Sequence, residues 1–281
     1  MAETAKQKKL QWHPAFYAGI QIELEEERDK LIFENEHQLS TKPLGVDVVI
    51  IKKLPGIQIQ KNLGRIFRGH NIVEYKGPGD SFSIDDFYKV YGYACIYKAD
   101  TAKNNEIKAE DITLTFAVTH FPREMLKEIQ RTRNLQVVKV DEGIYHISGD
   151  MFPIQIIHTT KLSKENNFWL KNLTNDLKKK EDAEYLLKRY SEKKQENLYQ
   201  SVMDIIVKAN LELFEEVDDM CDALMEIVKP KVEAKVQAAR EEVKIELINK
   251  KLAKGMPIED IADFMEESVE TIQRLMNLQN C

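Results

Sequence analysis

Three charged residues on two short apolar segments are the residues of this chain best suited to chemistry. Asp47 lies in the otherwise apolar run 46–51, and Glu74 and Lys76 lie two positions apart in the run 71–76. A carboxylate buried in such a run is costly unless a metal ion, a basic group or a proton compensates its charge. Two carboxylates and a lysine at one place could hold a divalent cation and position a nucleophilic water.

The two segments must be neighbouring strands if these side chains are to meet. Both are rich in β-branched residues and are bounded by stretches that contain Pro and Gly, a pattern that predicts short strands. Because side chains alternate along a strand, Glu74 and Lys76 share one face and Tyr75 lies on the other. Pairing of the two strands would let Asp47 converge with Glu74 and Lys76.

An Asp on one strand followed by Glu-x-Lys on the next resembles the core of the PD-(D/E)XK nuclease-like superfamily. The surrounding sequence is similar to a bacterial group within it, the PD-(D/E)XK family transposases and related nucleases. The resemblance covers roughly the first third of the chain and extends loosely over residues 99–160. Val46 stands where the superfamily's name has Pro, a residue that provides no ligand. The segments that carry the resemblance are 12–16, 39–47, 67–76 and 83–93.

The resemblance implies an endonuclease that depends on Mg²⁺ or Mn²⁺ and cleaves nucleic acid, DNA rather than RNA, with a link to transposition or recombination. Asp47, Glu74 and the backbone carbonyl of Tyr75 would hold the metal ion. Lys76 would orient the attacking water or stabilise the charge that develops on phosphorus. In this superfamily a glutamate from a helix often joins the metal site, and Glu23 matches it by position.

Two predicted helices supply further candidate residues. The first covers residues 12–26, and Glu23 lies at the edge of its apolar stripe, either as a metal ligand or as a solvent-facing member of an acidic segment. The second covers residues 83–98, opens with a capping pattern and carries Tyr88 and Lys89 beside its buried stripe. These two side chains could contact phosphate, although tyrosine-rich helices usually place them at the rim of a core.

Charge is distributed unevenly along the chain. The net charge is −6, but the acidity belongs to residues 201–281, which carry 18 Asp and Glu against 10 Lys and Arg. Residues 52–70, which connect the two motif strands, carry five Lys and Arg and no acid. Lys61, Arg65 and Arg68 in this connection are predicted to contact a phosphate backbone, with a solvated loop as the alternative.

The order of the predicted elements favours an α/β fold. Helix, strands, helix, strand, helix and strands follow one another over residues 1–160 and predict a restriction-endonuclease-like core, a central mixed sheet flanked by helices. The nuclease core to which the motif is similar has the same arrangement. His120, His146 and His158 are scattered through this region, do not resemble a ligand set and are interpreted as core or edge histidines.

Beyond the predicted sheet the strand pattern ends and helix-forming residues dominate. Region 161–255 is predicted to be helical, and its apolar residues from Val202 to Ile227 recur at three- and four-residue steps. Such a stripe packs on the chain's own domain or forms a homodimer. Residues 256–281 form a separate helical hairpin with a degenerate helix-turn-helix pattern, and six acids against one Arg over 258–276 argue against direct DNA binding.

Composition limits the remaining possibilities. With 281 residues, 43% hydrophobic and 31% charged, the chain can form one large or two small domains. It has no apolar run long enough to span a bilayer and no apolar signal core at its N-terminus, so no membrane partner is expected. Cys95, Cys221 and Cys281 lack metal-ligand spacing and favour a reducing, cytoplasmic setting. The alternative function is a non-catalytic interaction or DNA-binding protein that keeps the nuclease fold.

Overall fold

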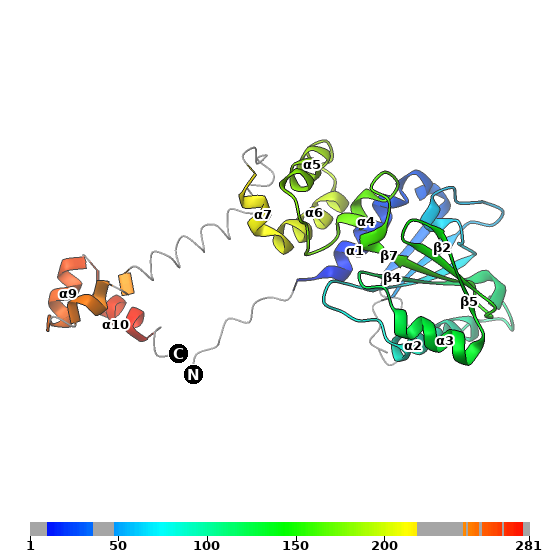
Figure 1. Ribbon diagram of the computed structural model, residues 1–281, viewed down its shortest axis with the longest axis horizontal. Helices are drawn as coiled ribbons and strands as arrows, with labels where there is room; N and C mark the ends of the chain where they lie inside the picture. Colours follow the sequence, from blue (N-terminus) through cyan, green and yellow to red (C-terminus); the bar gives the residue numbers. More distant parts are fainter. Residues whose placement is uncertain are drawn as a thin grey trace. The chain divides into compact units, whose positions relative to one another are not determined.

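The structure, a computed structural model, describes residues 10–35, 48–217, 244–245, 247–252, 255–265 and 267–277. Contacts divide the chain into two compact units; the larger spans Leu10–Asp219, and the described residues of the other lie within Met220–Cys281. Figure 1 shows a sheet with helices on both of its faces in the larger unit and helices in the described part of the other.

Seven strands of the larger unit form one mixed sheet in the order β1-β2-β3-β4-β7-β6-β5. β1, β2 and β3 pair antiparallel, β3, β4 and β7 run parallel to one another, and β6 and β5 continue antiparallel from β7. This sheet and the helices on it confirm the predicted α/β class. The strands are β1 (Leu31–Asn35), β2 (Val48–Lys53), β3 (His70–Lys76), β4 (Ile112–Val118), β5 (Gln136–Asp141), β6 (Ile144–Ser148) and β7 (Ile154–His158).

Two helices cover one face of the sheet because the parallel pairs require crossovers. A strand cannot be followed by a parallel neighbour through a tight turn, so the chain must travel back across the sheet. α2 (Ile84–Ala99) makes this crossover between β3 and β4, and α3 (Arg123–Arg133) with the β5–β6 hairpin connects β4 to β7. Apolar side chains of both helices and of the sheet form the core on this face, with Phe87, Ile129, Phe116 and Ile156 fully buried.

The opposite face of the sheet is covered by α1 (Trp12–Glu23). The ring of Phe16 stacks on that of Tyr75 in β3, with 4.2 Å between the ring centroids. α4 (Phe168–Asn172) and α6 (Asn197–Ala209) pack in turn against α1. The compact unit therefore continues past residue 160, the predicted domain boundary, because one helix packs on the sheet and on the later helices.

The long helix predicted from Val202 is interrupted within the described chain. α6 ends at Ala209 and a short helix, α7 (Leu211–Glu215), follows it. Asn210 lies at the break: its amide nitrogen donates to the carbonyl of Thr174 at 2.7 Å, and its side-chain oxygen accepts from the backbone of Leu177 at 3.0 Å. The predicted apolar stripe beyond Val217 lies outside the described residues. The remaining helical segments of this unit are α5 (Lys180–Ser191), η1 (Glu25–Lys30), η2 (Asn62–Gly64), η3 (Ala109–Asp111) and η4 (Thr159–Lys161).

The smaller unit contains the two short helices predicted near the C-terminus. They are α9 (Ile258–Met265) and α10 (Val269–Asn277). Ile261 and Ala262 of the first helix and Ile272 and Leu275 of the second are buried together with Ile248. Across the described residues of both units, no helix is both long enough and apolar enough to cross a lipid bilayer.

Gly143 fixes the turn of the β5–β6 hairpin against the end of β7. Its φ is +71°, and its carbonyl accepts a hydrogen bond from the backbone N–H of His158 at 2.7 Å. A Cβ atom at this position would lie 2.8 Å from the carbonyl oxygen of His158 and from the backbone nitrogen of Leu162. Only glycine combines the left-handed conformation with so close a backbone approach.

We expect Gly143→Ala to destabilise the protein more than Gly79→Ala. Gly79 also has a positive φ, of +88°, but a Cβ there meets nothing within 4 Å, so its replacement costs only the left-handed conformation, about 1–2 kcal/mol. At Gly143 the overlap with backbone atoms adds a cost on the order of 1–3 kcal/mol. Urea unfolding of both variants measures the difference, and equal free energies of unfolding would show that the hairpin does not depend on this approach.

Candidate active site

β3 places the Glu-x-Lys pair and the tyrosine between them on opposite faces of the sheet. Lys76 meets α2 through its contact with Asp86, whereas Tyr75 packs on α1 through Phe16. Burial raises the pKa of the Tyr75 hydroxyl well above its usual range. The side chain of Tyr75 is therefore part of the core, and only its backbone remains as a candidate ligand.

The ammonium group of Lys76 lies between two carboxylates. Its Nζ is 2.9 Å from Oδ1 of Asp86 and 3.5 Å from Oε1 of Glu74. Glu74 is almost fully buried, and Asp86 and Lys76 are partly buried. The contact with Asp86 has the length of a charge-assisted hydrogen bond, about 2.7–2.9 Å, whereas the contact with Glu74 is longer. Lys76 is thus held more closely by the helix than by its neighbour on the strand.

The pKa values of this cluster follow from burial and from the opposite charges. Burial acts to lower the pKa of Lys76, but the hydrogen bond to Asp86 and the charges of Glu74 and Asp86 outweigh it, and the pKa is raised. Burial acts to raise the pKa of Asp86, but hydrogen bonds from Ser83 and Lys76 outweigh it, and the pKa is lowered. Lys76 is therefore a fixed positive charge at neutral pH.

The first turn of α2 explains why Asp86 reaches Lys76. Ser83 and Asp86 form a capping box: the Asp86 backbone N–H donates to Oγ of Ser83 at 3.1 Å, and Oδ2 of Asp86 accepts from the Ser83 backbone N–H at 2.9 Å. The other carboxylate oxygen of Asp86 is left to face Lys76. The sequence predicts the capping pattern but not this second contact, because no local sequence pattern relates the start of the helix to the end of β3.

Asp47 lies outside the described residues. β2 begins at Val48, whose Cα is opposite that of Glu74 in the β2–β3 pair. The described pairing therefore does not test whether Asp47 lies near Glu74. Among the residues that the structure does describe, no three His, Cys, Asp or Glu side chains are grouped so that they could hold a metal ion. The described cluster by itself therefore does not provide three such ligands.

The structure places Glu23 beside Lys61 and the first turn of α4. Glu23 is 7% exposed; its Oε1 accepts from the backbone N–H groups of Trp169 and Leu170 at 2.7 and 3.1 Å, and its Oε2 is 3.1 Å from Nζ of Lys61. Burial raises the pKa of Glu23, opposed by the charge of Lys61 and by these backbone hydrogen bonds. Glu23 is thus buried rather than solvent-facing, and it binds the N-terminal end of α4.

The other predicted nucleic-acid contacts are on the surface. Arg65 and Arg68, in the connection between β2 and β3, are exposed, and Nε of Arg65 donates to the carbonyl of Gln60 at 3.1 Å. Tyr88 and Lys89 are exposed on α2. These four side chains are accessible to a ligand, whereas the predicted Lys61 is bound to Glu23 and to the carbonyl of Asn166.

No family model, curated protein or solved structure matches this chain.

We expect Glu23→Ala to destabilise the fold by about 3 kcal/mol, because it leaves two buried backbone N–H groups at the start of α4 without an acceptor. Glu26→Ala, an exposed neighbour, should change the free energy of unfolding by less than about 0.5 kcal/mol. Urea unfolding in EDTA and in Mn²⁺ tests this. A Glu23→Ala protein of wild-type stability that no longer gains stability from Mn²⁺ would show instead that Glu23 is a metal ligand.

Proposed function

We propose that this protein is a metal-dependent nuclease of the PD-(D/E)XK type, which hydrolyses phosphodiester bonds of nucleic acid, DNA rather than RNA. The observation that supports this most is the cluster of Glu74, Lys76 and Asp86 at the carboxyl end of β3. The order of α1, three strands, α2 and β4 also agrees with the nuclease core that the motif resembles. Function is inferred here from the site, since a fold by itself supports many activities.

The donor atoms suit Mg²⁺ or Mn²⁺. These cations prefer carboxylate and carbonyl oxygens and commonly use only one or two protein carboxylates, with water and substrate phosphate completing the shell. Glu74 and the backbone carbonyl of Tyr75 would hold the ion together with Asp47, which precedes β2 in the sequence. The contact of 3.5 Å between Glu74 and Lys76 is long enough for Glu74 to serve such a role. A bound ion would polarise the scissile phosphate and lower the pKa of a water molecule.

Lys76 would provide a fixed positive charge at the reacting phosphate. Its raised pKa keeps it protonated, and the contact with Asp86 holds its ammonium in place. A charge that is already oriented stabilises the negative charge of the transition state without further reorganisation. Asp86 is then a positioning residue, which acts through Lys76 and is itself fixed by the capping box of α2.

One feature of the cluster favours a second function, a nuclease-like protein that binds nucleic acid without cleaving it. Lys76 already contacts both Glu74 and Asp86, so its charge is compensated among the described residues without a cation. A site that is electrostatically satisfied in this way could serve stability alone. Catalysis requires that a metal ion compete with Lys76 for Glu74, and that the substrate phosphate compete with these carboxylates for Lys76.

The free thiol of Cys95 agrees with the reducing, cytoplasmic setting that belongs to this proposal.

We expect Glu74→Gln to abolish Mn²⁺- and Mg²⁺-dependent cleavage and to weaken Mn²⁺ binding, because it removes a charged ligand. Lys76→Met should lower kcat by about 10²-fold or more, as the loss of one electrostatic stabiliser does, while Mn²⁺ binding is retained. The measurements are cleavage of plasmid, single-stranded DNA and RNA with each cation or EDTA, and calorimetric titration with Mn²⁺. Asp47→Asn, tested in the same way, shows whether the residue before β2 belongs to the site.

Asp85→Asn is the matched control for these variants. Asp85 is an exposed carboxylate beside Asp86 in the first turn of α2, so its replacement changes the charge without touching the cluster. It should cleave at the wild-type rate. A wild-type protein that binds DNA but cleaves none of the substrates with either cation would contradict the nuclease and support the binding protein.

A further inference from the structure

A pocket of about 580 Å³ opens at the carboxyl ends of the three parallel strands. Pro78 follows β3, Thr119 and His120 follow β4, and His158 and Lys161 lie at and after the end of β7. A second hollow of about 500 Å³ shares Phe121, Arg123, His158 and Lys161 with it and extends over the β5–β6 hairpin. In open α/β sheets, ligands bind in the crevice outside the carboxyl ends of the strands. The volume is typical of small-molecule sites.

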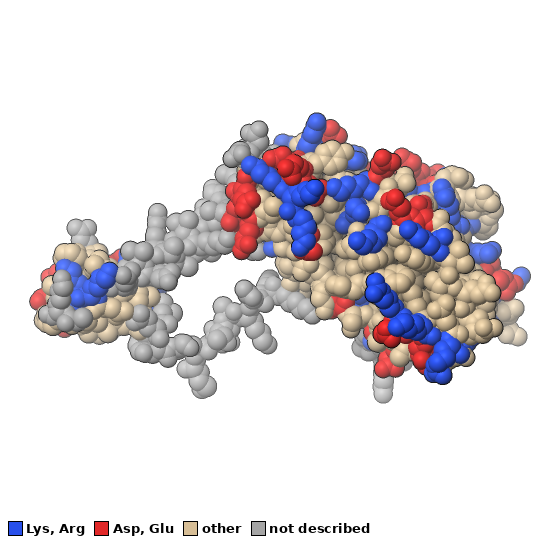
Figure 2. Space-filling model, in the orientation of Figure 1, with Lys and Arg blue, Asp and Glu red and all other residues tan. Residues whose placement is uncertain are grey.

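Three basic side chains line this pocket and the hollow beside it. Arg123 comes from the start of α3, Lys161 from the chain after β7, and Lys139 from β5. All three are exposed, and among the residues that the structure describes none of them forms an ion pair. Lys61 and Lys76, in contrast, are bound to carboxylates. In Figure 2 basic side chains lie on both sides of a mostly uncharged band that runs across the larger unit.

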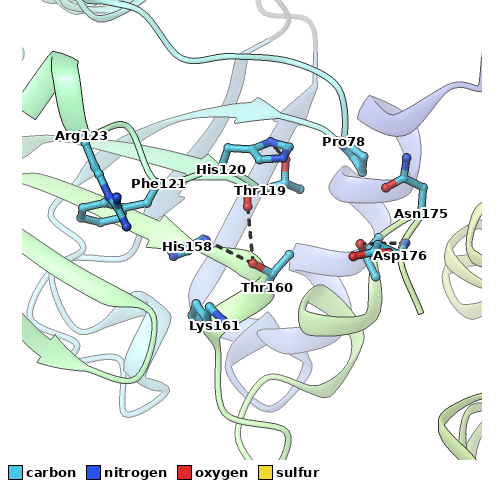
Figure 3. Close-up of a pocket in the computed structure, with 11 residues that line it drawn as sticks. Pro78, Thr119, His120, Phe121, Arg123, His158, Thr160, Lys161, Asn175 and Asp176 are labelled. Carbon is cyan, nitrogen blue, oxygen red and sulfur yellow. Dashed lines mark hydrogen bonds between the residues drawn. The ribbon is translucent and has the colours of Figure 1, made fainter. Parts of the chain in front are cut away.

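The acidic side chains at the pocket do not cancel this charge. Figure 3 shows Arg123 on one side of the pocket and Asn175 and Asp176 on the opposite side. Glu142 lines only the second hollow and is exposed. The cations are therefore free to bind an anion that enters between them.

His158 reports the positive character of the pocket. Burial lowers its pKa, a hydrogen bond with the backbone of Thr119 opposes this, and the nearby charges of Lys161, His120 and Lys171 lower the pKa further. The neutral ring is hydrogen-bonded through Nε2 to Oγ1 of Thr160 at 3.1 Å, and this hydroxyl lies 3.4 Å from the carbonyl of Thr119 (Figure 3). The ring is thereby fixed in the lining of the pocket, and the positive charge there comes from the arginine and the lysines.

Aromatic rings form an apolar wall beside these cations. The ring of Phe121 is 4.7 Å from that of Tyr145 and 5.6 Å from that of His158, measured between centroids. All three rings are half-buried, so each keeps an accessible surface. A flat heterocycle could stack on such a wall, an interaction that every nucleic-acid base can make.

The pocket lies on the same sheet edge as the candidate active site. Lys76, Val118 and His158 are paired in register across β3, β4 and β7, so their side chains share one face. The two strand spacings between Lys76 and His158 amount to about 10 Å. This is the span of a few nucleotides, since one strand of B-DNA rises about 3.4 Å per nucleotide.

We propose that this pocket is a nucleotide subsite of the strand that the active site cleaves. Arg123 and Lys161 hold a phosphate of that strand, and the wall of Phe121 and Tyr145 takes the adjoining base. The inference rests on the proposed nuclease function for the identity of the strand, but the binding itself does not require cleavage.

The main test is the double variant Arg123→Ala/Lys161→Ala, compared with Arg131→Ala/Lys188→Ala. The control removes the same charge from exposed positions that do not line the pocket. Binding of a short single-stranded DNA is measured in EDTA at several salt concentrations. The pocket variant should lose about tenfold in affinity, and its log–log salt slope should fall by about 0.7, the contribution of one phosphate contact on a single strand. The control should keep the wild-type affinity and slope.

A second test separates the base from the phosphate. Calorimetry compares a deoxynucleoside 5′-monophosphate with inorganic phosphate, on the wild type and on Phe121→Ala. The wild type should bind the nucleotide about tenfold more tightly, within the range for stacking on one aromatic ring, and Phe121→Ala should remove that difference. Equal binding of both probes by the wild type would overturn the base-binding part of the proposal.

The outcome for the pocket is distinguishable from the outcome for the nuclease. Equal DNA affinity and salt slope in the pocket variant and the control would overturn the subsite, whether or not the protein cleaves. Failure of the nuclease function would appear separately, as an absence of cleavage by the wild type with Mg²⁺ or Mn²⁺, and would leave the binding result in EDTA unchanged. Thermal unfolding of each variant verifies that the exposed substitutions leave the fold intact.

Discussion

The parallel pairing of β3, β4 and β7 is the constraint on which the rest of this structure depends. Parallel strands cannot be joined by tight turns, so α2 and α3 must cross the same face of the sheet, where they bury an apolar core. The same pairing brings three strand ends to one edge. At that edge Lys76 meets the first turn of α2, and the chain after β4 and β7 forms the nucleotide pocket. Both candidate sites therefore follow from the topology of the sheet.

The buried carboxylate of Glu23 joins the sheet-bearing half of the larger unit to the helices that follow it. Glu23, at the end of α1, accepts two backbone N–H groups of α4 and contacts Lys61 from the β2–β3 connection. A carboxylate at a helix N-terminus is favourable, and burial strengthens the attraction while it increases the cost of an unpaired charge. The acidic residue that the motif comparison suggests as a metal ligand thus serves the packing of two regions that the sequence separates.

The sequence allows the α/β class and the alternation along β3 to be predicted, because both depend on local patterns. Strands with β-branched residues and the capping box of α2 lie where periodicity indicates them. The contacts that define the site could not be predicted in the same way. Asp86 and Lys76 are ten positions apart on different elements, and His120 and His158 meet at one pocket only because β4 and β7 are neighbours. The break at Asn210 depends likewise on the distant Thr174.

Whether a basic side chain is already paired with an acid, rather than how many basic residues a segment carries, decides which of them can bind an anion in this protein. Residues 52–70 carry five Lys and Arg and no acid, but Lys61 in this segment is bound to a buried glutamate. Arg123 and Lys161 are unremarkable in sequence, yet no described acid pairs with them, and the sheet brings them to one pocket. A cation already paired must give up its partner before it can bind phosphate, whereas an unpaired one gives up only water. The overall charge of −6 is therefore compatible with a local surface that attracts nucleic acid.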